Sequence, residues 1–569
     1  MSELPSKKPR VFVSKNLNVQ SWNDISKYFE DLLNRNLHSI EDLKLWLSHR
    51  SELDAVLEED MAWRYIKMCI DTKDKNLSDD FNFFVREISP KISSYSNKLD
   101  KKLNSCNFFS DLEDSQYKIY KRSLRNSLDI FREENVKLKS QMTEKEQEYG
   151  SICAKMSVDI DGVKMTMQEA SEIMKDNDRS KRESAYLKIW NRRLEDKEKL
   201  DLLFDKLIVM RQNISYNADF NNYRDYKFKE LGRFDYNVDD CFEFHKSIKE
   251  SVVPVISQWE LERKTKLNLD VLKPWDLSVD TSGKQPLKPF KNEKDLIDKT
   301  IKCLNKIDPY FGWCIDSMHK MGHLDLSSKI GKAPGGFNYP LYEIGVPFIY
   351  MNSVGSSNDV TVMLHEGGHA VHSFLSRDLE LTQFKGLTSE IAELASMSME
   401  LISMDGWDVF YDNQEDLNRA KRQQLRRALN TMPWVAMVDA FQHWVYTSKH
   451  NNSERITKWS DLQSVFSPNV DWSGVENMLG YQWQKQLHLY EVPFYYIEYA
   501  MAQLGAIAVW KNYKTNKNKA LDQYKSALSL GYTKNIGEIY ETAGIEFNFS
   551  SNYIKELCQF VISEYNNIK

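Results

Sequence analysis

Two histidines and a glutamate at close spacing form the clearest chemical motif in the chain. The segment reads His365-Glu366-Gly367-Gly368-His369 and lies inside an apolar-patterned run from 360 to 375. On a helix, residues four apart differ by about 40° in direction and about 6 Å in rise, so both imidazoles can bind one metal ion. Glu366 points about 100° around the helix, where it can reach a metal-bound water without binding the metal. The spacing predicts the HExxH motif of a zinc peptidase.

The two glycines inside this predicted helix are unusual. Each costs about 1 kcal/mol of helix stability relative to alanine. A purely structural helix gains nothing from Gly367 and Gly368, whereas a helix that substrate or another backbone approaches closely requires small residues. The pair therefore favours a helix with a functional role.

An acidic stripe on the next predicted helix offers a third metal ligand. Glu390, Glu393 and Glu400 lie in the run 388–400, and separations of three and seven residues keep them on one side of a helix. A catalytic zinc site needs three protein ligands and leaves the fourth position to water. The spacing alone does not choose among the three carboxylates. The alternative is a solvated face on which Glu390 caps the helix.

With these two motifs in view, the chain resembles a known family. His365–His369 followed by Ile391-Ala-Glu393-Leu-Ala-Ser396 is similar to the thimet oligopeptidase and oligoendopeptidase F family of zinc peptidases, and it resembles the oligoendopeptidase F branch most. The similarity continues through 332–337, 347–352 and 530–533 and covers about residues 197 to 569. It implies that Glu393 is the third ligand and that each chain binds one Zn²⁺. It also implies a large helical, two-lobed ellipsoid whose deep channel admits short unstructured peptides and excludes folded proteins.

The resemblance also assigns a catalytic role to a segment near the carboxyl end. Residues 488–499 are similar to the family segment whose His and Tyr side chains contact the substrate carbonyl. Such donors stabilise the negative charge that develops on the carbonyl oxygen. We predict His488, Tyr496 and Tyr499 as catalytic residues, because the two tyrosines are three apart and share one helical face. Tyr495 is predicted to bind substrate.

Four further residues are candidates for supporting roles. Tyr350 and Asn352 are predicted to contact substrate, and Asn352 and Glu400 are candidates for orienting substrate backbone or a ligand imidazole. His372 follows His369 by three residues on the same face. A fourth protein ligand there would displace the catalytic water, so we predict that His372 lies beside the site or only packs.

Mostly helical elements must position these residues. Only 21 Gly and 14 Pro are present in 569 residues, so long helices have few stopping points. The exception is 153–167, which alternates around Asp161-Gly162 and predicts a β-hairpin. We expect a helical domain over 1–196 that contains this hairpin, followed by a catalytic domain over 197–569.

A small β-sheet is predicted beside the HExxH helix. Residues 324–329 and 346–351 both have the pattern of short strands. Pro347 cannot donate a ladder hydrogen bond, so the second strand is predicted to be an edge strand. An exposed edge could hold an extended peptide through main-chain hydrogen bonds.

Composition excludes several classes of protein. The chain has 77 Lys plus Arg, 83 Asp plus Glu and 41% hydrophobic residues, which predicts a folded protein with a formal charge of −6. This balance gives no electrostatic reason to bind nucleic acid or an anionic membrane. Seven scattered cysteines indicate reduced thiols, and the polar first ten residues lack the apolar core of a signal peptide. We therefore predict a cytoplasmic protein without a membrane partner.

These observations predict a zinc-dependent oligopeptidase that hydrolyses internal bonds of short unstructured peptides. One alternative is an exopeptidase that releases C-terminal fragments, which would need a cation near the metal to bind the terminal carboxylate. Arg422, Arg426 and Lys485 are among many candidates for that cation. The other alternative is a non-catalytic helical binding protein, which the intact Glu366 disfavours. The sequence does not predict the oligomeric state.

Overall fold

Long helices build most of the chain, and many begin at an Asn, Asp or Ser that accepts a hydrogen bond from the first turn, as Ser39 does from the amide of Asp42. A computed structural model describes residues 3–329, 331–333 and 335–568. The amino-terminal helices are α1 (Asn23–Asn34), α2 (Ile40–Ile70), α3 (Lys75–Phe83), α4 (Ser89–Asn104), α5 (Asp114–Ile130) and α6 (Glu133–Ala154). The next are α7 (Met167–Glu172), α8 (Arg179–Leu194), α9 (Lys197–Asn217), α10 (Tyr223–Glu230), α11 (Val238–Ser251), α12 (Val253–Lys266), α13 (Glu293–Ile307) and α14 (Pro309–Lys320).

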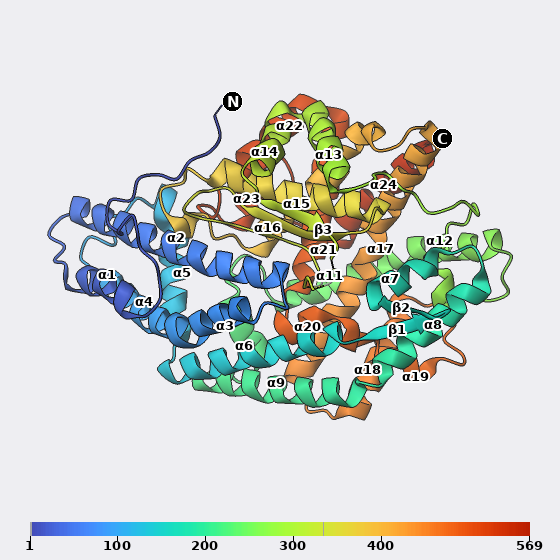
Figure 1. The fold of residues 1–569 in the computed structure, drawn as a ribbon, viewed down its shortest axis with the longest axis horizontal. Coiled ribbons are helices and arrows are strands. Elements are labelled where there is room, and N and C mark those ends of the chain that lie inside the picture. Colours follow the sequence, from blue (N-terminus) through green and yellow to red (C-terminus); the bar gives the residue numbers. More distant parts are fainter. Residues whose placement is uncertain (1–2, 330, 334, 569) are drawn as a thin grey trace.

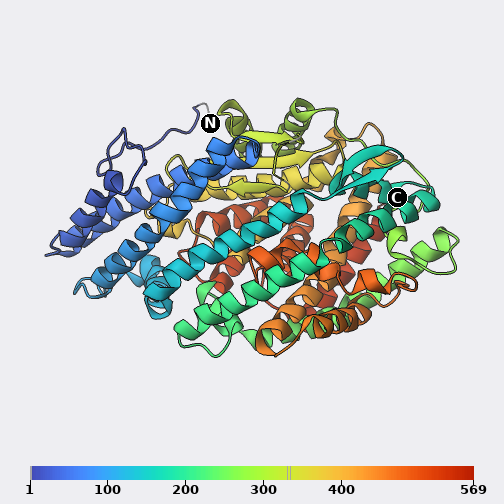
Figure 2. The same ribbon diagram turned by 60° about the horizontal axis from the view of Figure 1, so that its bottom comes forward.

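The remaining helices surround the predicted site. They are α15 (Ser357–Ser376), α16 (Ser389–Ile402), α17 (Gln414–Thr447), α18 (Asn452–Phe466), α19 (Glu476–Leu479), α20 (Leu487–Glu491), α21 (Tyr496–Thr515), α22 (Lys517–Ser529), α23 (Ile536–Thr542) and α24 (Ser551–Asn567). Helices α15 and α16 pack together, and α16 packs against α21 on its other side. Figures 1 and 2 show these yellow and red helices stacked through the middle of the molecule. The principal hydrophobic core runs through this stack.

The predicted β-hairpin is confirmed. Strands β1 (Ser157–Ile160) and β2 (Val163–Thr166) pair antiparallel, with Ile160 opposite Val163. The two turn residues, Asp161 and Gly162, both have positive φ (55° and 80°). That backbone conformation is the one for which Asp-Gly pairs are favoured in two-residue hairpin turns.

The second sheet contains three strands in the order β3–β5–β4: β3 (Leu324–Ser327), β4 (Phe337–Tyr339) and β5 (Phe348–Ser353). Strand β5 pairs parallel with β3 and antiparallel with β4. The prediction that 346–351 is an edge strand is therefore wrong. Pro347 immediately precedes β5, so its missing N–H removes no hydrogen bond from the ladder. The strand that flanks the site with a free edge is β4.

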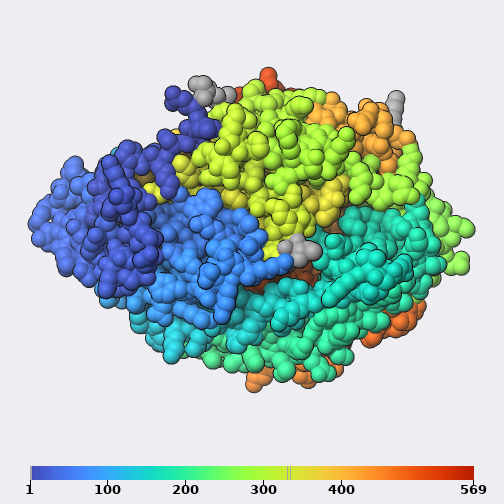
Figure 3. Space-filling model, viewed as in Figure 1, coloured from blue at the N-terminus to red at the C-terminus, as the bar shows by residue number. Residues whose placement is uncertain are grey.

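The overall shape is elongated, and helices form almost all of it (Figure 1). Figure 3 shows a narrow opening near the middle of one face, between the blue and cyan amino-terminal helices and the yellow segment, with red-brown carboxyl-terminal atoms at its base. The predicted fold class, mostly helical with a small sheet beside the HExxH helix, is confirmed.

Amino-terminal residues form a separate apolar cluster from Val13 to Leu124, joined by Leu381 and Phe384. The domain boundary at 196/197 stays a prediction.

No helix within the described residues is both long and apolar enough to cross a lipid bilayer.

Candidate metal centre and active site

Helix α15 carries both histidines of the motif. Its start is fixed by a capping box, in which the Ser356 hydroxyl accepts a hydrogen bond from the amide of Asp359 and the Asp359 carboxylate accepts one from the amide of Ser356. About two turns after the helix begins, His365 and His369 project from the same face, with ring centres 5.0 Å apart. The geometry expected for the i, i+4 pair is therefore present.

Helix α16 brings a carboxylate to this pair. Oε2 of Glu393 lies 3.2 Å from Nε2 of His365 and 3.7 Å from Nε2 of His369. Donors that surround a tetrahedral zinc at about 2.0–2.2 Å are themselves roughly 3.3–3.6 Å apart, so these three atoms fit such an ion. Two imidazoles and one carboxylate leave a coordination position for water. The Ser396 hydroxyl and the Tyr495 hydroxyl donate to the two oxygens of Glu393 and fix its orientation, at 2.9 and 3.0 Å.

The close approach of α16 to α15 explains one glycine of the motif. A Cβ atom on Gly368 would lie 2.6 Å from Cα of Ser396 and 2.7 Å from the carbonyl oxygen of Ala395. Both are backbone atoms of α16, which cannot move aside as a side-chain tip can. A Cβ on Gly367 would only make ordinary contacts, at 3.7 Å or more, with Ile315 and Leu304.

The acidic stripe of α16 is buried, so the alternative of a solvated face is wrong. Its three carboxylates have different partners. Oε1 of Glu400 accepts a hydrogen bond from Nδ1 of His365 at 2.7 Å, and its Oε2 accepts one from Gln424 at 2.7 Å. With Nδ1 committed as a donor, Nε2 of His365 is the nitrogen left for a metal. Glu390 instead accepts a hydrogen bond from the Tyr236 hydroxyl and does not face the histidines.

The charges of the site favour a bound cation. Burial opposes ionisation of Glu393, yet the neighbouring histidines and Ser396 outweigh it and lower the pKa of Glu393 to about 2. Burial also lowers the pKa of His369, to about 4, which keeps its imidazole neutral. Burial opposes protonation of His365 as well, but contacts with Glu393 and Glu400 raise its pKa well above 6.5. The carboxylates of Glu393 and Glu400 thus stabilise positive charge at this point of the site.

Glu366 lies beside the histidines but is not part of the converging group of donor atoms. The residue is 6% exposed and lines the same cavity as His365, His369 and Glu393. Burial raises the pKa of Glu366 to about 7. Its backbone carbonyl accepts a hydrogen bond from the Asn338 amide at 3.2 Å, which ties strand β4 to the start of the motif.

A chain of hydrogen bonds fixes the protonation of His488. The Trp434 indole can only donate, and it donates to Oε1 of Gln486 at 3.2 Å. Nε2 of Gln486 therefore faces Nδ1 of His488, at 2.6 Å. Nδ1 must accept, so Nε2 carries the proton of the neutral ring. Burial lowers the pKa of His488 to about 4, which keeps the ring neutral.

The tyrosines differ from the predicted pair. Tyr495 and Tyr499, four residues apart, both line the cavity, and the Tyr499 hydroxyl lies 3.5 Å from Nε2 of His488. Neither Tyr496 nor His488 is among the described residues that line the cavity. The Tyr496 ring packs edge-on against the His488 ring, with centres 4.8 Å apart. The reason is that α21 begins at Tyr496, so Tyr495 occupies the cap position and precedes Tyr499 by a full helical turn.

Three other predicted residues lie around the site in different ways. The Tyr350 side chain is fully buried, and its hydroxyl donates to the backbone carbonyls of Cys69 and Ala333, so it serves the loop before β4. The Asn352 amide also donates to Ala333, and to Gly335. His372 lines the cavity at 1% exposure, and burial lowers its pKa to about 3.

The cavity holds about 350 Å³ and is bounded by β4, α15, α16 and the start of α21. Sequence reasoning missed several of its residues. Asn338, Arg377 and Lys385 line it, and Trp434 and Gln486 support His488 from outside. No spacing rule joins these residues to the motif, because their proximity arises only from the packing of α15, α17, α20 and the sheet.

The fold and the site define a metallopeptidase, and comparisons with known proteins give the family. The model of peptidase family M3 matches residues 173–558, and that of the peptidase M3 N-terminal domain matches residues 12–131. The chain therefore belongs to peptidase family M3.

Individual relatives agree with this assignment. An oligoendopeptidase F homolog of Borreliella burgdorferi is 24% identical over 533 residues, which cover 89% of this chain and 85% of the relative. Oligopeptidase PepF of Bacillus subtilis is 22% identical, covering 54% of this chain and 46% of PepF. Among solved structures, PZ peptidase A with an inhibitor has a TM-score of 0.90 at 25% identity, covering 98% of this chain and 99% of that one. Oligoendopeptidase F from Enterococcus faecium shares the fold, with a TM-score of 0.65 at 13% identity and coverage of 96% and 97%.

Proposed function

We propose that the chain is a zinc-dependent oligopeptidase that cleaves internal bonds of short, unstructured peptides. The observation that carries this proposal is the convergence of His365, His369 and Glu393 beside the buried carboxylate of Glu366. These three residues would hold one Zn²⁺ in the active site. A zinc ion in that position polarises a carbonyl and lowers the pKa of a bound water to about 7. The names of the relatives above support a peptide substrate.

Glu366 handles the proton of the reaction. Its carboxylate accepts a proton from the attacking water and then passes it to the departing amine. Both steps need a base whose pKa lies near the working pH, and burial moves the pKa of Glu366 in that direction. Its position in the cavity beside both histidines supports this role.

His488 and Tyr499 stabilise the carbonyl oxygen as it becomes negative. The proton on Nε2 of His488 and the Tyr499 hydroxyl lie 3.5 Å apart and would act as a pair of donors, and Tyr499 lines the cavity. Tyr495 is already engaged with Glu393, so we assign it to holding that ligand.

Strand β4 is the element proposed to bind the peptide backbone. Within the described residues its one ladder partner is β5, and Phe337 and Asn338 line the cavity. A peptide added to its free edge would be held by main-chain hydrogen bonds, which ignore side-chain identity. We therefore expect broad sequence selectivity.

An internally quenched peptide of about eight residues, blocked at both ends, tests the proposal. Cleavage by the zinc-loaded protein, lost on chelation and restored by added zinc, is the expected result. Binding of the peptide without any cleavage would contradict the proposal and leave the non-catalytic alternative.

Release of fragments only from a free C-terminus would instead identify an exopeptidase. One observation favours keeping that second candidate, because two cations, Arg377 and Lys385, line the cavity. The cations predicted from the sequence are engaged elsewhere: Arg422 donates to the backbone of Ile568, Arg426 to Tyr565, and Lys485 lies over the Trp434 ring.

We expect the fall of kcat/KM at acid pH to follow the protonation of Glu366. The carboxylate accepts a proton only when ionised, so kcat/KM falls as the pH drops through its pKa. Burial raises that pKa from 4.5 to about 7, and a bound cation would lower it partway back, so we expect the fall between these values. Zinc content measured at each pH separates this effect from metal loss. A fall at or below pH 4.5 with zinc still bound would contradict the assignment.

Substitutions of Gln486 test the tautomer of His488. Gln486→Met removes the donor to Nδ1 and frees the ring to place its proton on either nitrogen, so we expect kcat/KM to fall roughly tenfold or more. Gln486→Glu places a carboxylate against Nδ1 and draws the proton of the neutral ring away from Nε2. The carboxylate also raises the pKa of His488, so the activity of this variant relative to wild type at the same pH should be highest at low pH, where both nitrogens are protonated, and should fall as pH rises. Wild-type pH profiles in both variants would refute the role of Gln486.

We also propose a cytoplasmic location. All seven cysteines are free thiols in the structure, which agrees with a reducing compartment.

A further inference from the structure

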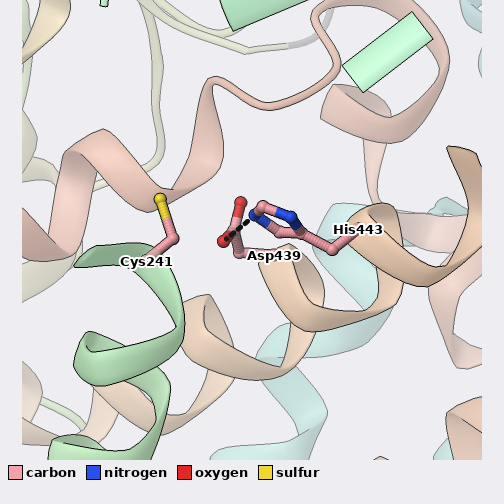
Figure 4. A group of neighbouring side chains, drawn as sticks. All are labelled: Cys241, Asp439 and His443. Atoms are coloured by element: carbon pink, nitrogen blue, oxygen red, sulfur yellow. Dashed lines mark ion pairs between the residues drawn. The ribbon is translucent and has the colours of Figure 1, made fainter. Parts of the chain in front are cut away.

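A second group of metal-ligand side chains lies between α11 and α17. Cys241 and His245 are four residues apart on α11, and Asp439 and His443 are four residues apart on α17. Each pair therefore projects from one face of its helix, and the two helices pack against each other. Figure 4 shows Asp439 between Cys241 and His443, with one side chain from the green helix and two from the orange one.

The donor atoms of three of these residues, Cys241, Asp439 and His443, are as close together as those of the active site. Sγ of Cys241, a carboxylate oxygen of Asp439 and a ring nitrogen of His443 all lie within 4.8 Å of one another. Oδ2 of Asp439 is 3.2 Å from Nε2 of His443 and 2.8 Å from Nε2 of His245. The corresponding nitrogen–oxygen distances in the active site are 3.2 and 3.7 Å.

Several of these polar atoms lack the partners that burial normally requires. Asp439 is fully buried and His443 is 3% exposed. The 3.2 Å approach between them does not have the geometry of a hydrogen bond. Within the described residues, Oδ1 of Asp439 and both ring nitrogens of His443 form no hydrogen bond. Such orphaned groups are costly inside a protein, and a bound ion would satisfy them.

The charged groups in and around this cluster would be balanced by one divalent cation. The rings of Phe228, Phe242 and Phe494 lie 5.0–5.9 Å from the His443 ring and add no charge. Arg233 is the buried cation of this region, and Glu498 neutralises it at 2.6 Å. A thiolate at Cys241 and the Asp439 carboxylate would together balance a divalent ion, and the His443 imidazole would be a neutral ligand.

We propose that Cys241, Asp439 and His443 bind a second Zn²⁺ that has a structural role, with the His245 imidazole hydrogen-bonded to the Asp439 carboxylate. A thiolate and an imidazole favour zinc over magnesium, calcium or manganese, which prefer oxygen ligands. The three ligands come from two packed helices and none of them lines the active-site cavity, which fits a structural ion. The sequence predicted one zinc per chain; this site raises the number to two.

The site also connects to catalysis through its neighbours. Gln442, between the two α17 ligands, accepts a hydrogen bond from the amide of Phe494 at 2.6 Å. Phe494 packs on the His443 ring and directly precedes Tyr495, which holds Glu393. An ion that fixes α11 against α17 would therefore fix the segment that carries Tyr495.

Metal content and cobalt spectroscopy test this site without relying on activity. We expect the purified full-length protein to contain two zinc ions per chain by elemental analysis, and His365→Ala/His369→Ala to contain one. In the cobalt-substituted protein, a thiolate ligand gives a sulfur-to-metal charge-transfer band in the near ultraviolet. The active site contains no cysteine, so the band belongs to the second site alone and should persist in His365→Ala/His369→Ala.

Cys241→Ser should abolish the band, and Cys303→Ser, a change at another fully buried cysteine, should leave it unchanged. If Cys241→Ser does not fold, the band in the His365→Ala/His369→Ala protein still decides the question. A single zinc per wild-type chain and no charge-transfer band would overturn the proposal and leave a buried carboxylate–histidine network. Because the count of ions is independent of peptide cleavage, failure of this proposal would leave the proposed peptidase function untouched.

Discussion

Glu366→Gln is expected to lower kcat by about 10²- to 10⁴-fold while the zinc content of the chain stays unchanged. The amide has nearly the shape of the carboxylate but cannot accept the proton of the attacking water. Glu366 makes none of the ligand contacts that His365, His369 and Glu393 make, so its neutralisation leaves the metal in place. Single-turnover cleavage of the blocked peptide, with elemental analysis of the same sample, measures both quantities.

Glu400→Gln is the matched comparison. Glu400 touches His365 and not the cavity, so its replacement should lower zinc affinity by about tenfold or more and spare the turnover of the zinc-saturated protein. Equal losses of kcat in the two zinc-saturated variants would mean that Glu366 is not the base.

The second large effect is expected at Gly368. Gly368→Ala places a methyl group against the backbone of α16, 2.6 Å from Cα of Ser396, and α15 and α16 must separate to accommodate it. We expect the free energy of unfolding to fall by about 1–3 kcal/mol, as for other overpacked cores. The same separation moves Glu393, one turn before Ser396, away from the histidines, so zinc affinity and activity should fall as well.

Gly367→Ala is the control at the adjacent position. Its methyl group would meet only side-chain atoms at 3.7 Å or more. Alanine favours the helix over glycine by about 1 kcal/mol, so this variant should be as stable as the wild type or slightly more stable. Denaturant unfolding and zinc titration of the two variants check the contrast. Equal stability of the two would show that the close approach of the helices does not constrain the motif.

Local patterns predicted the parts of the site that lie on one helix or in one turn. The spacing of His365 and His369 and the Asp161-Gly162 turn each depend on a few consecutive residues, so the chain's geometry follows from the sequence. The glycine pair also indicated that another element approaches this helix closely. The sequence could not show that Gly368 faces the backbone of α16 while Gly367 faces only side chains. The choice of Glu393 among three carboxylates came from the family resemblance, because α16 is buried all round and its faces look alike in the sequence.

Local patterns could not predict contacts between elements that are far apart in the sequence. The edge-strand prediction for 346–351 was wrong because Pro347 precedes the strand, and a shift of one residue decides whether its missing N–H matters. The pair Tyr495 and Tyr499 depends on where α21 begins. The support of His488 by Gln486 and Trp434 depends on α17 meeting α20, and no short-range signal reports that contact.

Phe494, which lies directly before the active-site residue Tyr495, has a strained backbone conformation. This large residue has a φ of 68°, a left-handed conformation that costs about 1–3 kcal/mol for a residue with a side chain. Gln442 and Arg233 hold its backbone, and the aromatic rings around it hold its side chain. Folding thus bears the cost of arranging Tyr495 before any peptide arrives, and substrate binding need not bear it. Glycine at 494 would relieve this strain but would leave a cavity in place of the fully buried ring, at a cost of about 3–5 kcal/mol, so the aromatic packing keeps the strained residue in place.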